Sequence, residues 1–151
     1  MKIVGIDPGL TGAFALLDKG ELVEVRDMPV VMVRGKGRIL AWGVVDAIVN
    51  LNPDHVVIEE VGVMPKQGIA SGFNFGYGAG VLEGVTAALA RPLTLVRPNV
   101  WKRESATPTD KGAARQMASR LWPDKADLFA RVKDDGRAEA ALLARWYLTR
   151  N

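Results

Sequence analysis

Acidic residues follow two apolar runs in this sequence, and two more lie near its end. Asp7 follows KIVGI, and Glu59 and Glu60 follow HVVI. Asp135 and Glu139 are four residues apart, so a helix would carry both on one face. Carboxylate oxygens are preferred by the hard divalent cations Mg²⁺ and Mn²⁺. Two such ions can activate a water and stabilise the leaving oxygen when a phosphodiester is cleaved, and this is the chemistry we expect.

The same acids have ordinary structural roles that stay open at this point. Asp7 precedes Pro-Gly and could hydrogen-bond the turn that follows it. Asp134 or Asp135 could cap the last helix, and the helix dipole would favour Glu139 in its first turn. The chain has no cysteine and one histidine. This composition excludes disulfides, thiolate metal sites and cysteine nucleophiles, and it argues against a histidine-rich zinc site.

Short strands and helices must position these acids. The pattern of apolar residues predicts strands over 2–6, 13–18, 22–28, 55–61 and 93–97 and helices over 39–51, 81–90, 108–122 and 134–148, with Thr107 as the N-cap of the third. Between them we expect a basic loop over 33–38 and, over 62–80, a segment too rich in glycine to be regular throughout.

The order of these elements predicts one α/β domain over residues 1–151. Three strands form an antiparallel meander, and two more join it in parallel, which gives a mixed five-stranded sheet flanked by helices. If the first and fourth strands are parallel neighbours, their carboxyl ends meet at one edge of the sheet. Asp7 would then lie beside Glu59 or Glu60, of which only one can face it, because neighbouring side chains point to opposite faces of a strand.

Composition limits the class of protein. Hydrophobic residues make up 48% of the chain, and the net charge of +3 with a pI near 9.4 suggests an anionic partner. No apolar run approaches 18 residues. We therefore expect a cytoplasmic protein with no membrane association and no organic cofactor.

Three segments carry a resemblance to a known family. GIDPGLTGAFAL, VVIEEV followed by MPKQGIASGFNFGYGAGVLEGV, and KDDGRAEAALLA occur in this order over nearly the whole chain. Together they resemble the RuvC family of Holliday junction resolvases, in particular its phage and prophage branch. The resemblance implies a ribonuclease H-like fold, a homodimer, and Mg²⁺-dependent nicking of two opposing strands in a four-way DNA junction. It also implies that the cytoplasm is that of a bacterial or phage-infected cell.

The resemblance also assigns the site. Asp7, Glu59, Asp135 and Glu139 match the catalytic and metal-binding acids, which would hold two Mg²⁺ ions per site, with Mn²⁺ able to substitute. Glu139 stands where the family usually has aspartate, which changes the geometry of that ligand. Bacterial members often carry an aromatic three residues after the acid of the fourth strand, and this chain has Gly62 there.

Basic and aromatic residues are candidates for binding DNA. Phosphate contacts come mainly from lysine and arginine, and exposed aromatics can stack on bases. The candidates are Lys66, Phe73, Phe75, Lys102, Arg103, Lys111 and Arg115. Because Gly62 has no side chain, opening of the junction would fall to Phe73 or Phe75. Core packing of the aromatics and a solvated helix face for Lys111 and Arg115 are the structural alternatives.

The expected activity is that of a crossover junction endodeoxyribonuclease, which resolves branched DNA by symmetric paired nicks through attack of a metal-activated water. An RNA-processing nuclease of the same superfamily is one alternative, and a non-catalytic junction-binding protein is another. An actin-like or sugar-kinase-like ATP-binding protein is disfavoured, because such proteins duplicate the domain and 151 residues hold one copy.

Overall fold

The computed structural model describes residues 1–60, 62 and 68–150. Its main sheet has five strands in the order β3-β2-β1-β6-β7. β1 is antiparallel to β2 and parallel to β6, so three antiparallel strands are joined by two parallel ones as the sequence predicts. The strands are β1 (Lys2–Asp7), β2 (Ala13–Asp18), β3 (Glu21–Asp27), β6 (His55–Glu59) and β7 (Leu93–Val96).

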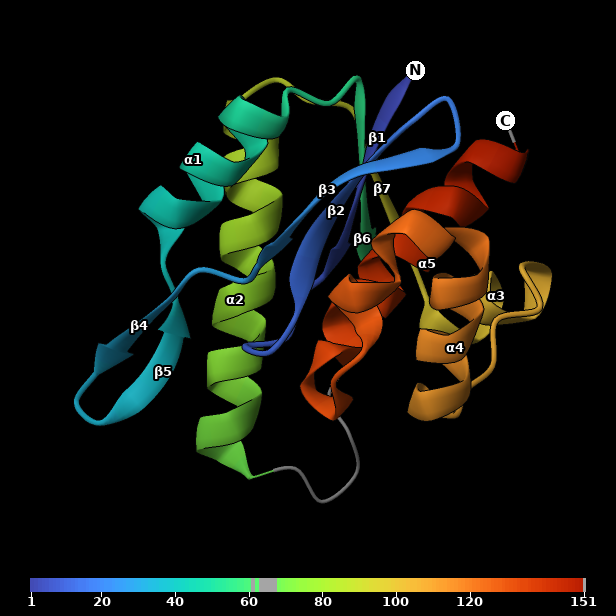
Figure 1. Cartoon of the computed structure of the whole chain (residues 1–151). Coiled ribbons are helices and arrows are strands. Elements are labelled where there is room, and N and C mark those ends of the chain that lie inside the picture. Colours follow the sequence, from blue (N-terminus) through green and yellow to red (C-terminus); the bar gives the residue numbers. More distant parts are fainter. Residues whose placement is uncertain (61, 63–67, 151) are drawn as a thin grey trace.

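Helices cover both faces of this sheet (Figure 1). One face carries α1 (Ala41–Leu51) and α2 (Ile69–Ala88), and the other carries α3 (Pro98–Glu104), α4 (Lys111–Leu121) and α5 (Asp135–Arg150). Two short 3-10 segments, Pro123–Phe129 and Val132–Asp134, link α4 to α5. Among the described residues, no helix combines the length and apolar composition needed to cross a membrane.

The strands at the centre of the sheet bury both faces. Successive side chains of a strand point to opposite faces, so Ile3 packs into the core under α5 while Val4 packs into the core under α1 and α2. In β6, Val57 belongs to the α5 side, and Val56 and Ile58 belong to the other. This alternation decides on which face the acids at the strand ends lie.

Helix α5 lies unusually close to β1. A Cβ built on Gly5 would fall 2.1 Å from the carbonyl oxygen of Ala140 and 2.7 Å from the backbone nitrogen of Ala144. At the start of the helix, a Cβ on Gly136 would fall 2.5 Å from the carbonyl oxygen of Thr11. Both positions exclude a side chain, so the two glycines set the distance between α5 and the sheet edge.

The prediction of a loop over 33–38 is wrong. Val30–Val33 (β4) and Lys36–Ile39 (β5) form a two-stranded antiparallel hairpin instead. Its two-residue turn has positive φ at both positions, 50° at Arg34 and 76° at Gly35, which type I′ hairpin turns require. The hairpin extends away from the main sheet beside α2 (Figure 1).

The prediction of irregular structure over 62–80 is wrong from Ile69 onward. A single helix, α2, continues through the segment 81–90 that the sequence predicts as a separate helix. Glycine weakens an isolated helix by about 1 kcal/mol per residue, yet packing compensates here. A Cβ on Gly78 would lie 2.8 Å from Ile39 Cδ1, so this glycine lets α2 approach β5, and Leu82 is fully buried.

The predicted N-cap at Thr107 is also wrong. Asp110 caps α4, because its carboxylate accepts a hydrogen bond of 2.8 Å from the backbone N–H of Ala113. Thr107 is buried and its hydroxyl lies 2.8 Å from that of Ser105. The short helix α3 before this turn was not expected from the sequence, and it carries Trp101 into the core.

We expect Gly5→Ala to lower the free energy of unfolding by about 3 kcal/mol, because the added methyl group must displace the backbone of α5. Gly84→Ala is the matched control: its Cβ would meet nothing within 4 Å, and alanine should stabilise α2 by about 1 kcal/mol. Urea unfolding followed by circular dichroism measures both. Equal stability of Gly5→Ala and the wild type would contradict the close approach.

Candidate active site

The sheet brings Asp7 and Glu59 to the same edge and the same face. Ile6 pairs with Ile58 in the parallel register of β1 and β6, so the next residues along the two strands are Asp7 and Glu59. Asp7 continues the face of Ile3 and Gly5, and Glu59 continues that of Val57, which is the α5 side. Glu60 belongs to the opposite face, and its carboxylate lies 3.4 Å from Arg97 Nε.

Helix α5 adds Glu139 to this pair. Its first turn lies over the end of β1, where a Cβ on Gly136 would fall 3.0 Å from Asp7 Oδ2. One turn later, Glu139 is close enough that its charge raises the pKa of both Asp7 and Glu59. Three of the four predicted acids are therefore electrostatically coupled across two strands and one helix.

Burial and like charge disfavour the ionised form of Asp7. Removal from water raises its pKa first, the charges of Glu139 and Glu59 raise it further, and the result is a pKa of about 7. The backbone N–H of Gly9 opposes this shift through a hydrogen bond of 3.4 Å to Asp7 Oδ1. Asp7 thus accepts a hydrogen bond from the turn that follows it, as one interpretation of the sequence predicts. Its carboxylate is also destabilised by burial and by the two neighbouring acids.

Trp101 positions Glu59 and was not expected from the sequence. Its indole N–H donates a hydrogen bond of 2.7 Å to Glu59 Oε2. This hydrogen bond lowers the pKa of Glu59, but burial outweighs it and the pKa stays raised. The indole is fully buried beneath the sheet edge. A tryptophan beside a basic residue, Trp101-Lys102, offers no sequence pattern that would have indicated this contact.

Three of the predicted DNA-binding cations contact the acids in this structure. Lys102 Nζ lies 2.6 Å from Glu139 Oε1, and both side chains are largely buried. Arg115 Nε donates to Asp135 Oδ1 at 2.9 Å, while Lys111 Nζ is 3.8 Å from the other oxygen of Asp135. Lys111 and Arg115 therefore point toward the start of α5, and the prediction that they contact phosphates stays a prediction.

The structure separates the roles of Asp134 and Asp135. Asp134 is 1% exposed, and it accepts hydrogen bonds from the backbone and guanidinium of Arg131. Arg137 also lies 3.7 Å from Asp134 Oδ1, and these partners, Arg131 foremost, hold the pKa of Asp134 below its usual value. Asp134 thus organises the turn before α5, whereas Asp135 opens the helix and faces the basic side chains of α4.

The donor chemistry of the site fits Mg²⁺, although its acids are engaged by cations here. Among residues 1–60, 62 and 68–150, no three acidic or histidine side chains lie close enough together to hold one ion as they stand. Glu139 is turned to Lys102 and Asp135 to Arg115. Burial raises the pKa of Asp7 most, and the charges of Glu139 and Glu59 raise it further; a divalent cation would relieve this repulsion between the carboxylates.

Of the remaining predicted residues, the structure describes Phe73, Phe75 and Arg103. Phe73 and Phe75 are on α2 rather than in a loop, and both are exposed. Phe75 borders a hollow that Pro8 and Leu10, from the turn after Asp7, also line. Arg103 is exposed on α3. Lys66 lies outside the described residues.

Comparison with solved structures identifies the fold. No family model matches the chain, and no curated protein is significantly similar to it in sequence. *Thermus thermophilus* RuvC in complex with a Holliday junction substrate superimposes with a TM-score of 0.71 at 17% identity, over 100% of this chain and 96% of that one. The chain has the RuvC fold.

A second, viral structure supports the same RuvC fold. The fowlpox virus Holliday junction resolvase matches with a TM-score of 0.65 at 18% identity, and the alignment covers 100% of both chains. The yeast mitochondrial Holliday junction resolvase is more distant, with a TM-score of 0.53 at 12% identity. The resemblance to RuvC resolvases given by the sequence motifs is thus confirmed at the level of the fold.

We expect Asp7→Asn to stabilise the metal-free protein at pH 8. The pKa of Asp7 is higher in the folded chain than in the unfolded one, so the folded state favours the protonated carboxyl. The contribution of Asp7 to the free energy of unfolding is therefore fully present below about pH 4 and is lost as pH rises through about 7. Asparagine does not ionise, so the variant avoids this loss. We expect its free energy of unfolding to exceed that of the wild type by up to about 4 kcal/mol at pH 8 and by almost nothing at pH 4. Thermal melting in EDTA from pH 4 to 8 measures it, and parallel curves for the two proteins would contradict the shift.

Proposed function

We propose that this protein is a metal-dependent endonuclease that resolves Holliday junctions and other branched DNA. The observation that carries the proposal is the convergence of Asp7, Glu59 and Glu139 at one sheet edge, where burial and then the charges of the two glutamates raise the pKa of Asp7 to about 7. The RuvC fold of the chain supports it, because *Thermus thermophilus* RuvC with this fold forms a complex with a Holliday junction substrate.

Asp7, Glu59, Glu139 and Asp135 would hold Mg²⁺, with Mn²⁺ able to substitute. When bound, two such ions supply an activated water and stabilise the leaving oxygen of the phosphodiester. The chain's own residues fix the ligands: Trp101 orients Glu59 through its N–H, and Gly9 orients Asp7. For more than two of the acids to bind one ion, Glu139 and Asp135 must exchange their lysine and arginine partners, which then become available to phosphates.

Cleavage of a synthetic four-way junction tests the proposal. Each strand is labelled in turn, and the wild type is compared in Mg²⁺ and in EDTA, with linear duplex and an RNA hairpin alongside. We expect paired, symmetric nicks that require the metal. Glu59→Gln should lower the rate by about a hundredfold or more, because it removes a predicted ligand.

Glu60→Gln is the matched control for that variant. Glu60 is adjacent in sequence, but it lies on the opposite face of β6 and contacts Arg97, so the rate should stay near that of the wild type. Equal loss in both variants would contradict the assignment of Glu59. Tight junction binding without nicks would favour a non-catalytic binding protein, and cleavage of the RNA alone would favour an RNA-processing nuclease.

We also propose that the protein acts as a homodimer, because paired nicks on a two-fold symmetric junction require two sites related by the same symmetry. The outer face of α2 around Gly76 is open to a second chain: Cβ atoms on Gly72, Gly76 and Gly80 would meet nothing within 4 Å.

We expect light scattering to give twice the 16.3 kDa chain mass for the wild type. Gly76→Leu should shift the protein toward the monomer, because the side chain would hold the two helices apart. Gln116→Leu places the same apolar side chain at an exposed position of α4, on the other face of the sheet, and should leave the mass unchanged. A dimeric Gly76→Leu variant would rule out close contact at this point of α2.

A further inference from the structure

The β4–β5 hairpin carries an isolated positive charge. Arg34, Lys36 and Arg38 lie on it, and the sequence from Met28 to Val45 contains no acidic residue. Arg34 and Lys36 are exposed, and the Arg38 guanidinium lies 4.6 Å from the ring centre of Tyr77 on α2. Within the part of the chain that the structure describes, none of the three forms an ion pair, in contrast to Lys102, Lys111 and Arg115 at the acids.

A hollow of about 590 Å³ lies between the hairpin and the first turns of α2. The three cations line it together with Val33, and apolar side chains of α2 form its other wall. Phe73 is 67% exposed and Ile69 is 94% exposed, although both are large apolar groups. The hollow thus combines cations with an exposed aromatic face.

A second hollow adjoins this one on the side of the turn that follows Asp7. A smaller hollow of about 110 Å³ is lined by Pro8 and Leu10, from the turn after Asp7, and by Asn74 of α2. Asn74 lines the larger hollow as well, and its side-chain amide donates a hydrogen bond of 3.0 Å to the carbonyl oxygen of Gly37 on the hairpin. The two hollows thus adjoin at Asn74, and together they are bordered by the turn after Asp7, the hairpin and α2.

We propose that the β4–β5 hairpin and the first turns of α2 form a second DNA site, which binds an unpaired strand as it leaves the candidate active site. Phosphates contact Arg34, Lys36 and Arg38, and a base lies against Phe73. The inference deepens the proposed function and rests on it for the identity of the DNA.

The composition of the hollow favours a single strand over a duplex. The backbone of a duplex presents phosphates and sugars, for which cations suffice, while its bases are stacked inside. An unpaired strand also exposes the faces of its bases, and sites for single strands combine a basic groove with aromatic side chains. Here the aromatic wall and the basic hairpin face each other across the same hollow.

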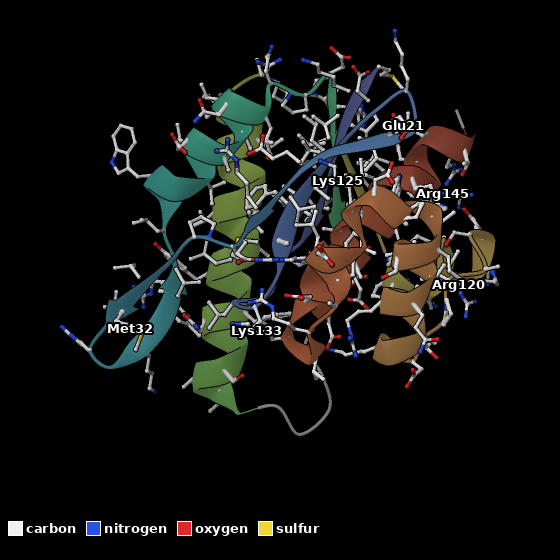
Figure 2. The ribbon with its side chains drawn as sticks, viewed as in Figure 1. Glu21, Met32, Arg120, Lys125, Lys133 and Arg145 are labelled. Atoms are coloured by element: carbon white, nitrogen blue, oxygen red, sulfur yellow. The ribbon has the colours of Figure 1, made fainter. Side chains whose placement is uncertain are left out.

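The test compares two triple variants by fluorescence anisotropy in EDTA, where no cleavage occurs. The probes are a labelled oligothymidine and a duplex of the same length, each titrated over a range of salt concentrations. The first variant changes Arg34, Lys36 and Arg38 to glutamine. The control changes Arg120, Lys125 and Arg145 to glutamine. These are again two arginines and one lysine, and they lie away from the hairpin, on which Met32 is labelled (Figure 2).

We expect the hairpin variant to bind oligothymidine about tenfold or more weakly at low salt, with the slope of log K against log salt reduced by about 2, and to change duplex binding much less. The control should match the wild type in both. Phe73→Leu keeps an apolar side chain without the aromatic face and should weaken oligothymidine binding by about tenfold.

Unchanged oligothymidine affinity and slope in the hairpin variant, or equal losses for strand and duplex, would overturn the inference. So would a change in oligomeric mass with unchanged affinity, which would assign the hairpin to contact between copies. Because binding is measured without metal, the two proposals can fail separately. If the wild type cuts no junction but the hairpin variant still loses strand binding, the nuclease proposal is refuted and this DNA site is retained.

Discussion

The close approach of α5 to β1 controls the geometry of the candidate site. Gly5 and Gly136 leave no room for a side chain between the helix and the sheet edge, so the backbone of α5 lies directly on β1. Since Glu139 is one turn into α5, its position relative to Asp7 depends on this contact. The charge of an acid on a helix can act on two acids at strand ends only if the helix lies at a fixed distance from the sheet and at a fixed position along the strands. Gly5 and Gly136 fix both.

The acids at the strand ends could be predicted from the sequence because they depend on two simple regularities. Apolar runs ending in acids indicate buried strands, and parallel strands bring their carboxyl ends together. The alternation of side chains then limits the choice to one of Glu59 and Glu60. The structure places Glu59 on the face of Asp7, which follows from strand register and needs no knowledge of loops.

The errors in the prediction arise where tertiary contacts decide local structure. The glycines of α2 argue against a helix in isolation, but Gly78 is needed for the approach of Ile39, which the sequence alone does not show. The β4–β5 hairpin has strands of four residues, too short for a clear alternation, and its turn places a non-glycine residue, Arg34, at positive φ. Contacts between distant side chains, such as Trp101 with Glu59, leave no periodic trace in the sequence.

The ion pairs around the acids determine how the site meets a polyanion. Four carboxylates stand against three cations, Lys102, Lys111 and Arg115, and the raised pKa of Asp7 favours its protonated form near neutral pH. The net charge of the group is therefore between −1 and 0 rather than −4. A bare acidic cluster would repel nucleic acid at the distances over which charges act in salt solution. This edge is close to neutral, so a phosphate backbone can approach it without an electrostatic barrier.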